Sequence, residues 1–585
     1  MKKVLALILA SIMVLSLASC AKKDDTDGTA KSAPPSIVYL YNEGEGHKAI
    51  GEYIQAALKS AGITVTLESQ EWNTFLNTRK DGNFTMARNG WLGDYNDPIS
   101  FLDMWITSSG NNDCQLGKGA HKNVAIYNLD MTPWGGNKVE NGTWAETYDV
   151  IIGMIKKETD NAKRLEMMHA AEDLLMSTGA IVPLYYYTDL YMIDDSVKGF
   201  YSSPLGYKYF LHTTVDGKDY LNVCLASEPD TLDPALNSAV DGATLTSHLF
   251  SGLAKWAQDE SGKLVIVADC AEELAAPVVN DDGTVTYTYT LKKGLKWSDG
   301  KALKASDFEF AWKRAASAEL GADYGYMFDV VMGYGTDDKD DLAVKADDAK
   351  GTITVTLSTS VAYWNELLAF PAYFPVRSDV VSNEAWATKP ETYISNGAYT
   401  MSAWEHDSKI TLKKSNTYHD AASVTMPTLN FFLSDDSNNM LANFKTGEWL
   451  MIDDVPTNEI ATLKAEYADE FVIAGQLGTY YACWNVNADL GVKDEAAKAE
   501  IRKAISLLLD RNYIVNDVAQ GGQVPASSFV AMGLTDTNGK EFYQNAGDEA
   551  ANGYIGYYDV SEKALAGNAE KAIATLEKYY KLNIK

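Results

Sequence analysis

The stretch QEWNTFLNTRKDGNFTMARNGWLGDYNDPISFLDMW (residues 70–105) determines how the chain folds. Within it, WNTFLNTRK (72–80) has the periodicity of a short helix, and FTMARNGW (84–91) has the character of a buried strand. Three elements precede this stretch: a strand, IVYLYN (37–42), a helix (His47–Ser60), and a strand, ITVTLES (63–69). The order β-α-β-α-β predicts a mostly parallel sheet.

Beyond this start, the chain is first helical and then rich in strands. Residues Tyr148–Ser177 are mainly helical, and IVPLYYYTDLYMI (181–193) returns as a strand. After DGKD (216–219), strands are predicted at 220–226, 284–300, 353–359 and 409–415, and amphipathic helices at Asp494–Asp510 and Asn568–Tyr580. These elements predict an α+β protein with α/β parts, organised as two large lobes.

The first 35 residues have the pattern of an export signal followed by a tether. Lys2 and Lys3 precede an apolar run that is too short to span a bilayer, and LASC (17–20) is a small-residue cleavage site ending in cysteine. We therefore expect a signal peptide over residues 1–19 and a lipid on Cys20, as in a bacterial lipobox. An ordinary signal peptide cut near this point is the alternative. Residues 20–35 hold few large apolar side chains and predict a flexible tether.

Length, composition and charge limit the classes of protein and of partner that fit this chain. The residues after the tether are too many for one core, and their number predicts three or four lobes. The hydrophobic content of 46% and aromatic content of 11% are typical of a well-packed protein. A formal net charge of −30 argues against nucleic acid or an anionic membrane surface as a partner, because both require basic patches.

The sequence offers no pattern for catalysis or metal binding. It contains neither HExxH nor GxSxG, and its seven histidines are scattered. SDGK (298–301) formally matches SxxK, but it lies between a strand and a helix and is predicted to be a turn. The acidic run at 337–341 lacks the EF-hand pattern. Four cysteines lack the spacing of a zinc site, and the sequence leaves their disulfide state open: Cys114, Cys224, Cys270 and Cys483. We expect no enzyme, metal or cofactor.

Five blocks of sequence resemble the oligopeptide-binding receptors of ABC importers, within the extracellular solute-binding proteins of family 5. They are the stretch quoted above, EPDTLDPALNSAVDGATLTSHLFSGL (228–253), LKKGLKWSDGKALKASDFEFAWKR (291–314), SNGAYTMSAW (395–404) and GTYYACWNVNADLGVKDEAAKAEIRKAISLLLDRNYIV (478–515). The resemblance implies a type II, three-domain clamshell that captures oligopeptides outside the cell. It also implies delivery to an ABC import permease, attachment to the outer face of the cytoplasmic membrane through Cys20, and a monomer.

The order of the segments departs from that of the family. Residues 36–212 resemble the C-terminal third of its members, and residues 220–585 resemble the first two thirds. The resemblance therefore implies a circular permutant joined through residues 213–219, which is tolerated where the original termini lie close together. A recombined gene with a poorly folded product is the alternative. The permutation predicts that the strand 37–42 lies in one sheet beside the strand containing Tyr481.

The resemblance also implies a division into domains. The implied main lobe comprises a return strand (191–212), 220–254 and 386–475; the accessory subdomain is 255–385; and the second lobe combines 476–585 with 36–190.

A receptor for peptides of arbitrary sequence must bind the two charged chain ends and the backbone ladder. Asp94, in WLGDYN (91–96), matches the family carboxylate that binds the peptide α-ammonium, and Arg88 matches an arginine that helps bind the peptide carboxylate. From the residues alone, Asp94 could be a turn residue before Pro98, and Arg88 could form a structural ion pair.

Other family positions map along the same cleft. His47 and Asn42 match positions near the carboxylate end of longer peptides, although a lone histidine is usually without function. The pocket walls match Trp72, Arg79, Trp91 and Tyr481, and the backbone contacts match Gly90 and Val240. Core packing is the alternative for the aromatic residues, above all for Trp72.

Two other functions remain open. The same fold can serve as a receptor for dipeptides, nickel complexes, haem, oligosaccharides or a cell-wall peptide. The Asp94 and Arg88 pair favours a ligand with zwitterionic ends, which a sugar receptor would not need. A sensing or adhesion lipoprotein without a transport role is the other possibility.

Overall fold

The start of the chain folds into parallel strands alternating with helices, as the sequence predicts. The computed structural model describes residues 31–336 and 338–584. Its first five elements are β1 (Ile37–Asn42), α2 (Glu45–Ser60), β2 (Val65–Gln70), α3 (Trp72–Lys80) and β3 (Met86–Leu92). Strand β1 pairs in parallel with both β2 and β3. Helix α2 buries Ile50, Ile54 and Leu58 because residues four apart share a helix face.

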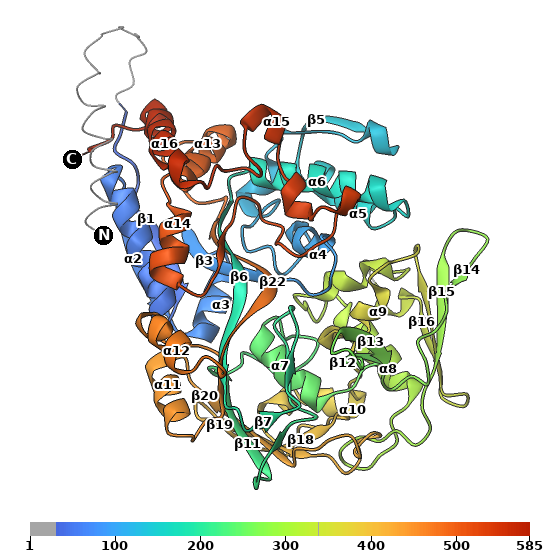
Figure 1. Cartoon of the computed structure of the whole chain (residues 1–585). Helices are drawn as coiled ribbons and strands as arrows, with labels where there is room; N and C mark the ends of the chain where they lie inside the picture. The colour runs from blue at the N-terminus through green and yellow to red at the C-terminus, as the bar shows by residue number, and fades with distance from the viewer. Residues whose placement is uncertain (1–30, 337, 585) are drawn as a thin grey trace, which may run out of the picture.

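One mixed sheet runs through both lobes of a clamshell (Figure 1). Among the described residues it has 11 strands, in the order β18 (Tyr399–Glu405), β19 (Lys409–Lys414), β20 (Thr428–Leu433), β11 (Tyr220–Ala226), β21 (Met451–Ile452), β6 (Ile181–Ile193), β22 (Phe471–Trp484), β3, β1 and β2, with β23 (Val524–Pro525) paired to β6.

Strands β6 and β22 connect the two lobes. They pair antiparallel along most of their length at the centre of Figure 1. At one end β22 pairs with β3, and at the other end β6 pairs with β21. Their register shifts between Gly475 and Thr479, where the ladder passes from one lobe to the other. The two lobes are therefore joined by a continuous two-stranded ribbon.

A second, antiparallel sheet forms a subdomain on the right of Figure 1. Its order is β14 (Val278–Val279), β15 (Val285–Thr290), β17 (Thr352–Leu357) and β16 (Val344–Asp347), and α8 (Ala305–Ala315) packs on it. The alternation in β15 buries Val285, Tyr287 and Tyr289, as expected for a strand with one core face.

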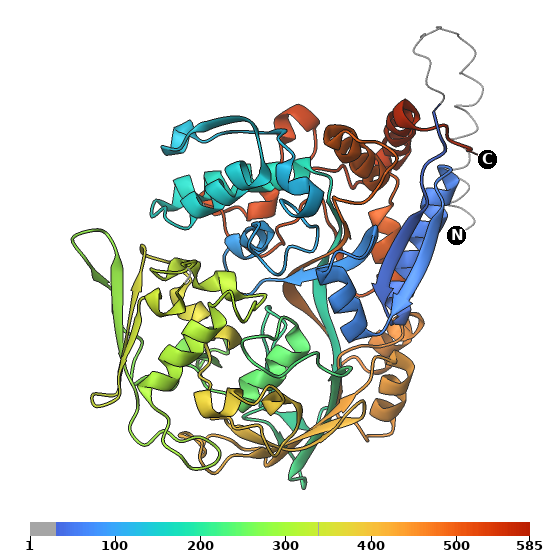
Figure 2. The same cartoon turned by 180° about the vertical axis from the view of Figure 1, so that it is seen from behind.

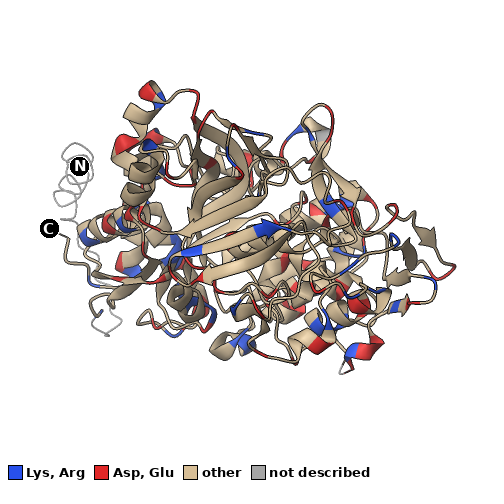
Figure 3. Ribbon diagram, turned by 90° about the horizontal axis from the view of Figure 1, so that it is seen from below, with Lys and Arg blue, Asp and Glu red and all other residues tan. Residues whose placement is uncertain are grey.

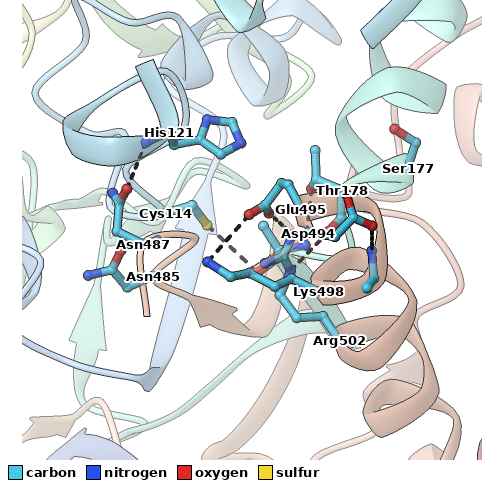
Figure 4. A network of polar contacts seen from close by, with 12 residues as sticks. Cys114, His121, Ser177, Thr178, Asn485, Asn487, Asp494, Glu495, Lys498 and Arg502 are labelled. Carbon is cyan, nitrogen blue, oxygen red and sulfur yellow. Dashed lines mark hydrogen bonds and ion pairs between the residues drawn. The ribbon is translucent and has the colours of Figure 1, made fainter. Parts of the chain in front are cut away.

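Helices from distant parts of the sequence pack together at the top of the second lobe (Figures 1 and 2). They are α5 (Val150–Ile155), α6 (Asn161–Ser177), α13 (Glu495–Leu507) and α16 (Leu565–Tyr579). Arg502 of α13 is 1% exposed, and its guanidinium donates to the carbonyl of Thr178, just past the end of α6, and to Glu495 (Figure 4). This cation satisfies the free carbonyl at a helix C-terminus.

The remaining elements are short. The helices are α4 (Ile99–Leu102), α7 (Val240–Leu249), α9 (Trp364–Leu367), α10 (Ser378–Val381), α11 (Ser437–Lys445), α12 (Ile460–Glu466), α14 (Arg511–Tyr513) and α15 (Glu549–Asn552). The strands are β4 (Tyr127–Asp130), β5 (Lys138–Gly142), β7 (Val197–Lys198), β8 (Tyr201–Ser202), β9 (Lys208–Tyr209), β10 (Thr214–Val215), β12 (Ala254–Gln258) and β13 (Leu264–Ala268).

Acidic and basic residues are interspersed over the helices and loops of both lobes (Figure 3). Within the described residues, no helix has the length and apolar character needed to cross a membrane.

Three sequence predictions need correction or completion. Strand β1 lies in the same sheet as β22 but not beside it, because β3 is inserted between them. The strand predicted over 284–300 ends already at Thr290. The residues after it form turns at Gly294 and Gly300, both of which have positive φ angles. The four cysteines between 114 and 483 are free and buried. Cys20, the signal peptide and most of the tether lie outside the described residues.

Candidate functional site

A cavity of about 550 Å³ lies between the two lobes. One wall comes from the loop after β1, α2, α3 and β3, and the other comes from β11, α7 and the segment after β21. The second lobe also meets the subdomain, where the Asn96 N–H donates to Glu366 and Lys156 pairs with Asp329. The second lobe and the subdomain are thus in direct contact next to the cavity.

Strand β3 presents a free edge to this cavity. Strand β22 covers one edge of β3 from Met86 to Leu92, but β1 covers the other edge only at Met86 and Ala87. Five residues from Arg88 to Leu92, all lining the cavity, therefore have no strand partner on that side among the described residues. An extended chain can pair with such an edge through its backbone.

Asp94 lies just beyond the end of β3, and 8% of it is exposed. Its Oδ1 accepts a hydrogen bond of 2.9 Å from the Tyr324 hydroxyl, whereas its Oδ2 is buried and has no partner among the described residues. Burial raises the pKa of this carboxyl well above its usual value, the Tyr324 hydrogen bond opposes the rise, and the charge of Asp103 adds to it. A cation next to Oδ2 would restore the charged form.

Arg88 projects from β3 into the same cavity. Its guanidinium lies 5.2 Å from the ring centroid of Tyr480 and 6.0 Å from that of Trp72. No carboxylate of the described residues lies within 4.0 Å of it, and its Nε has no hydrogen-bond partner there. Burial opposes its charge, but the nearby phenols of Tyr187 and Tyr480 outweigh burial and raise its pKa. The structural ion pair considered from the sequence is therefore absent from the described part of the chain.

His47 and Asn42 line the end of the cavity near α2. The His47 Nδ1 lies 3.1 Å from the Tyr480 hydroxyl, and the two rings stack. Burial, with the positive charge of Arg88, holds the pKa of His47 well below its usual value. The imidazole is thus neutral at pH 7, so it can offer a hydrogen bond but not a positive charge.

The other predicted wall residues also reach the cavity, with one exception. Those that line it are Trp72, Arg79, Gly90, Trp91 and Val240. Arg79 is already paired with Asp113, at 2.7 Å. Gly90 has no room for a side chain, since a Cβ there would lie 2.3 Å from the Tyr187 hydroxyl.

Tyr481 is the exception, because the structure places its side chain in the core and not on the cavity wall. Its ring packs edge-on against Trp105 and Phe529 in the core, and it is fully buried. Successive side chains of a strand point to opposite faces. The neighbour, Tyr480, is therefore the residue that turns toward His47 and Arg88.

Several polar groups of the cavity were not predicted. Lys208 lies 3.0 Å from Asp189 and 2.8 Å from Asp453, and all three are cavity-lining. Tyr324, the partner of Asp94, comes from the subdomain and carries no sequence signal that points to the cleft. Asp241, the second residue of α7, stands inside the block 228–253, but only the fold shows that it faces the cavity.

The alternative catalytic and metal sites find no support in the described residues. Lys301 of the SDGK turn pairs with Asp379 outside the cavity, at 3.1 Å. No group of three or more potential metal ligands is clustered in this part of the chain.

Comparison with known proteins places this geometry in a family. The model of the bacterial extracellular solute-binding proteins, family 5 Middle, matches residues 17–113 and 266–579. The oligopeptide-binding protein OppA of Bacillus subtilis is 31% identical over 353 residues, covering 58% of this chain and 62% of OppA. The dipeptide-binding protein DppE of the same organism is 30% identical, covering 57% and 59%. The chain thus spans about three fifths of the length of these relatives.

Two solved structures share the fold. Listeria monocytogenes OppA bound to peptide is 27% identical, with a TM-score of 0.50 over 62% of this chain and 69% of that chain. The Haemophilus influenzae OppA complex with RPPGFSPFR is 26% identical, with a TM-score of 0.52 over 62% and 67%. Since the family model matches more than half of the residues, this chain belongs to the bacterial extracellular solute-binding proteins of family 5.

Proposed function

We propose that this protein captures oligopeptides in the cavity between its lobes and delivers them to an ABC import permease. One observation carries the proposal: a buried acid with a free oxygen, Asp94, and a buried base without a carboxylate partner, Arg88, stand at the two ends of an unpaired strand edge. These are the complements of an α-ammonium, a carboxylate and a peptide backbone. His47 and Asn42 are placed to bind the carboxylate of a longer peptide.

The relatives support the same ligand class. Curated relatives are named as oligopeptide- and dipeptide-binding proteins, and two solved neighbours hold a peptide. We propose a binding role and no catalysis, because the charged groups of the cavity suit the two ends of a ligand. The two lobes would close on the ligand, because some contacts form only when both lobes touch it.

Native mass spectrometry of the purified protein, before and after gentle unfolding, tests this function. We expect a ladder of co-purifying masses that match short peptides. Calorimetric titration with a series of two to six alanines then gives the preferred length and separates an oligopeptide receptor from a dipeptide receptor. A protein that melts cooperatively but binds no member of the series would contradict the proposal.

We further propose that the protein is a monomer held at the outer face of the cytoplasmic membrane by a lipid on Cys20. The LASC motif supports this attachment. Expression of the Cys20→Ala variant should move the protein from the membrane fraction to the medium or periplasm. Metabolic labelling with a fatty acid should mark the wild type only, and unlabelled wild type would contradict the attachment.

We also propose that the order of the segments is a circular permutation of the family order, with the domain boundaries given above. The Lys581 N–H donates to the Ser32 carbonyl at 2.9 Å, so the segment after α16 runs beside the segment before β1. At the other junction, β10 pairs with β7, and a turn with positive φ at Gly217 leads into β11. Residues 220–585 make up a little over three fifths of the chain, close to the 62% that matches the solved structures.

A rearranged protein tests the permutation. A chain that runs from Tyr220 to Lys585 and then from Ser36 to Thr213 should bind the same peptides with similar affinity. If this protein fails to fold while the natural order melts cooperatively, the two orders are not interchangeable and the permutation is contradicted. Poor folding of the natural order itself would favour the recombined gene.

A further inference from the structure

Asp241 is an unpartnered acid in the cavity, separate from Asp94. It is the second residue of α7 and lines the cavity together with Trp72 of α3. Both of its carboxylate oxygens are buried and accept no hydrogen bond from the described residues. The Trp72 indole N–H and the backbone N–H groups of Asp241 and Gly242 lie close enough to this carboxylate to oppose the rise in its pKa, but none of them reaches it with full hydrogen-bond geometry. Nearby N–H groups thus stabilise this carboxylate only in part, and it lines the cavity without a cationic partner among the described residues.

The protein's own cations are engaged elsewhere. Three of the four lysine and arginine residues that line the cavity pair with other acids: Lys80 with Asp323, Arg79 with Asp113, and Lys208 with Asp189 and Asp453. The fourth, Arg88, lies against Tyr480 and forms no ion pair with the described residues. No described cation lies within 4.0 Å of Asp241.

Interaction with the start of α7 does not account for this acid. An acid in the first turn normally gains from the helix N–H groups, which would lower its pKa. Here the N–H groups of Gly242 and Asp241 do oppose the rise, but burial is the larger effect and raises the pKa of Asp241 to about 6, with the negative charge of Asp230 adding to it. The carboxylate is held where it is costly without a ligand, and a bound cation would offset that cost.

We infer that the Asp241 carboxylate binds the cationic side chain of a lysine or arginine residue in the captured peptide, beside the indole of Trp72. The inference rests on the proposed function and adds a substrate preference to it. Asp94 serves the α-ammonium that every peptide carries, whereas Asp241 distinguishes one side chain from another. The Trp72 ring provides an apolar and cation-attracting surface for the aliphatic stem and the charge.

Paired tetrapeptides test the preference. Each pair has alanine at all positions but one, which holds either lysine or norleucine, and binding is measured by calorimetry. At one position we expect the wild type to favour lysine by about tenfold or more. Asp241→Asn should bring this ratio close to one. Asp435→Asn removes the same charge from an exposed residue of the same cavity and should leave the ratio unchanged.

The remaining outcomes separate this inference from the proposed function. Asp94→Asn should weaken both members of each pair alike. If all tetrapeptides bind but the lysine to norleucine ratio of the wild type is near one at every position, the inference is overturned and the peptide receptor stands. If Asp241→Asn weakens both members of each pair equally, Asp241 holds the α-ammonium and the inference is again overturned. Failure of every tetrapeptide to bind contradicts the proposed function itself.

Discussion

Two sets of buried charges in this molecule differ in how completely their polar atoms are satisfied. Around Arg502, the guanidinium donates to Thr178 and Glu495, and Glu495 is also 3.6 Å from Lys498. In the cavity, Asp94 and Asp241 keep free oxygens. Burial therefore does not mark a functional site by itself. A buried acid that has a free oxygen and also lacks a cationic partner is the better sign, because its charge is costly until a ligand arrives.

The largest expected effect is on stability, and it comes from disrupting the hydrogen-bonded charges around Arg502. Arg502→Met should lower the free energy of unfolding by about 3–5 kcal/mol, because it leaves Glu495 buried without its main partner. Denaturant unfolding measures the loss. The double variant with Glu495→Leu should recover much of it, since no buried charge then remains. A single variant as stable as the wild type would mean that this pair is not structural.

Asp94→Asn should act in the opposite way, on binding rather than on folding. Peptide affinity should fall by roughly 2–5 kcal/mol, because the buried α-ammonium loses its counter-charge. The ligand-free protein should be as stable as the wild type or more stable, because the buried charge is gone. Calorimetry and thermal melting of the same sample check both. Unchanged affinity would remove Asp94 from the site.

The pKa of Asp241 predicts a pH dependence with a definite sign. The folded-state pKa of about 6 is above the usual value of 3.8, so the folded protein holds more protons than the unfolded chain between these two values. The Asp241 contribution to stability should therefore decline as pH rises from about 4 to 6, by about 1–3 kcal/mol. The stability difference between wild type and Asp241→Asn, measured at each pH, isolates it. A difference that does not change with pH would contradict the raised pKa.

The smallest expected effect is on peptide affinity, and it concerns Tyr480 and Tyr481, which are neighbours on β22. Tyr481→Phe should change peptide affinity by less than about twofold, because its hydroxyl lies in the core without a partner. Tyr480→Phe removes the hydroxyl that contacts His47 and should weaken binding more. Equal effects of the two substitutions would contradict the assignment of the two faces.

Local sequence patterns predicted the bounds of helices and strands better than the direction in which the side chains of a strand point. The helix 72–80 and the strands 37–42, 181–193 and 220–226 have the predicted bounds, because each has a clear period or an uninterrupted apolar run. The strand with Tyr480 and Tyr481 is buried on both faces, so no alternation indicated which tyrosine contacts His47 and Arg88.

Contacts between segments that lie far apart in the chain could not be predicted from the sequence. The insertion of β3 between β1 and β22 follows from the pairing of whole strands, which local patterns do not encode. Tyr324 of the subdomain meets Asp94 of the second lobe from 230 residues away. The chain positions of Asp94 and Arg88 were identifiable only through the family resemblance. Their missing partners became visible only in three dimensions.

The uncovered edge of β3 also bears on how this protein avoids self-association. An exposed strand edge on a protein surface invites other chains to add to it and can seed aggregates. Here the edge from Arg88 to Leu92 is enclosed between the lobes and is only a few residues long. The position of this edge between the lobes therefore shields it from the edge-to-edge pairing that seeds aggregates.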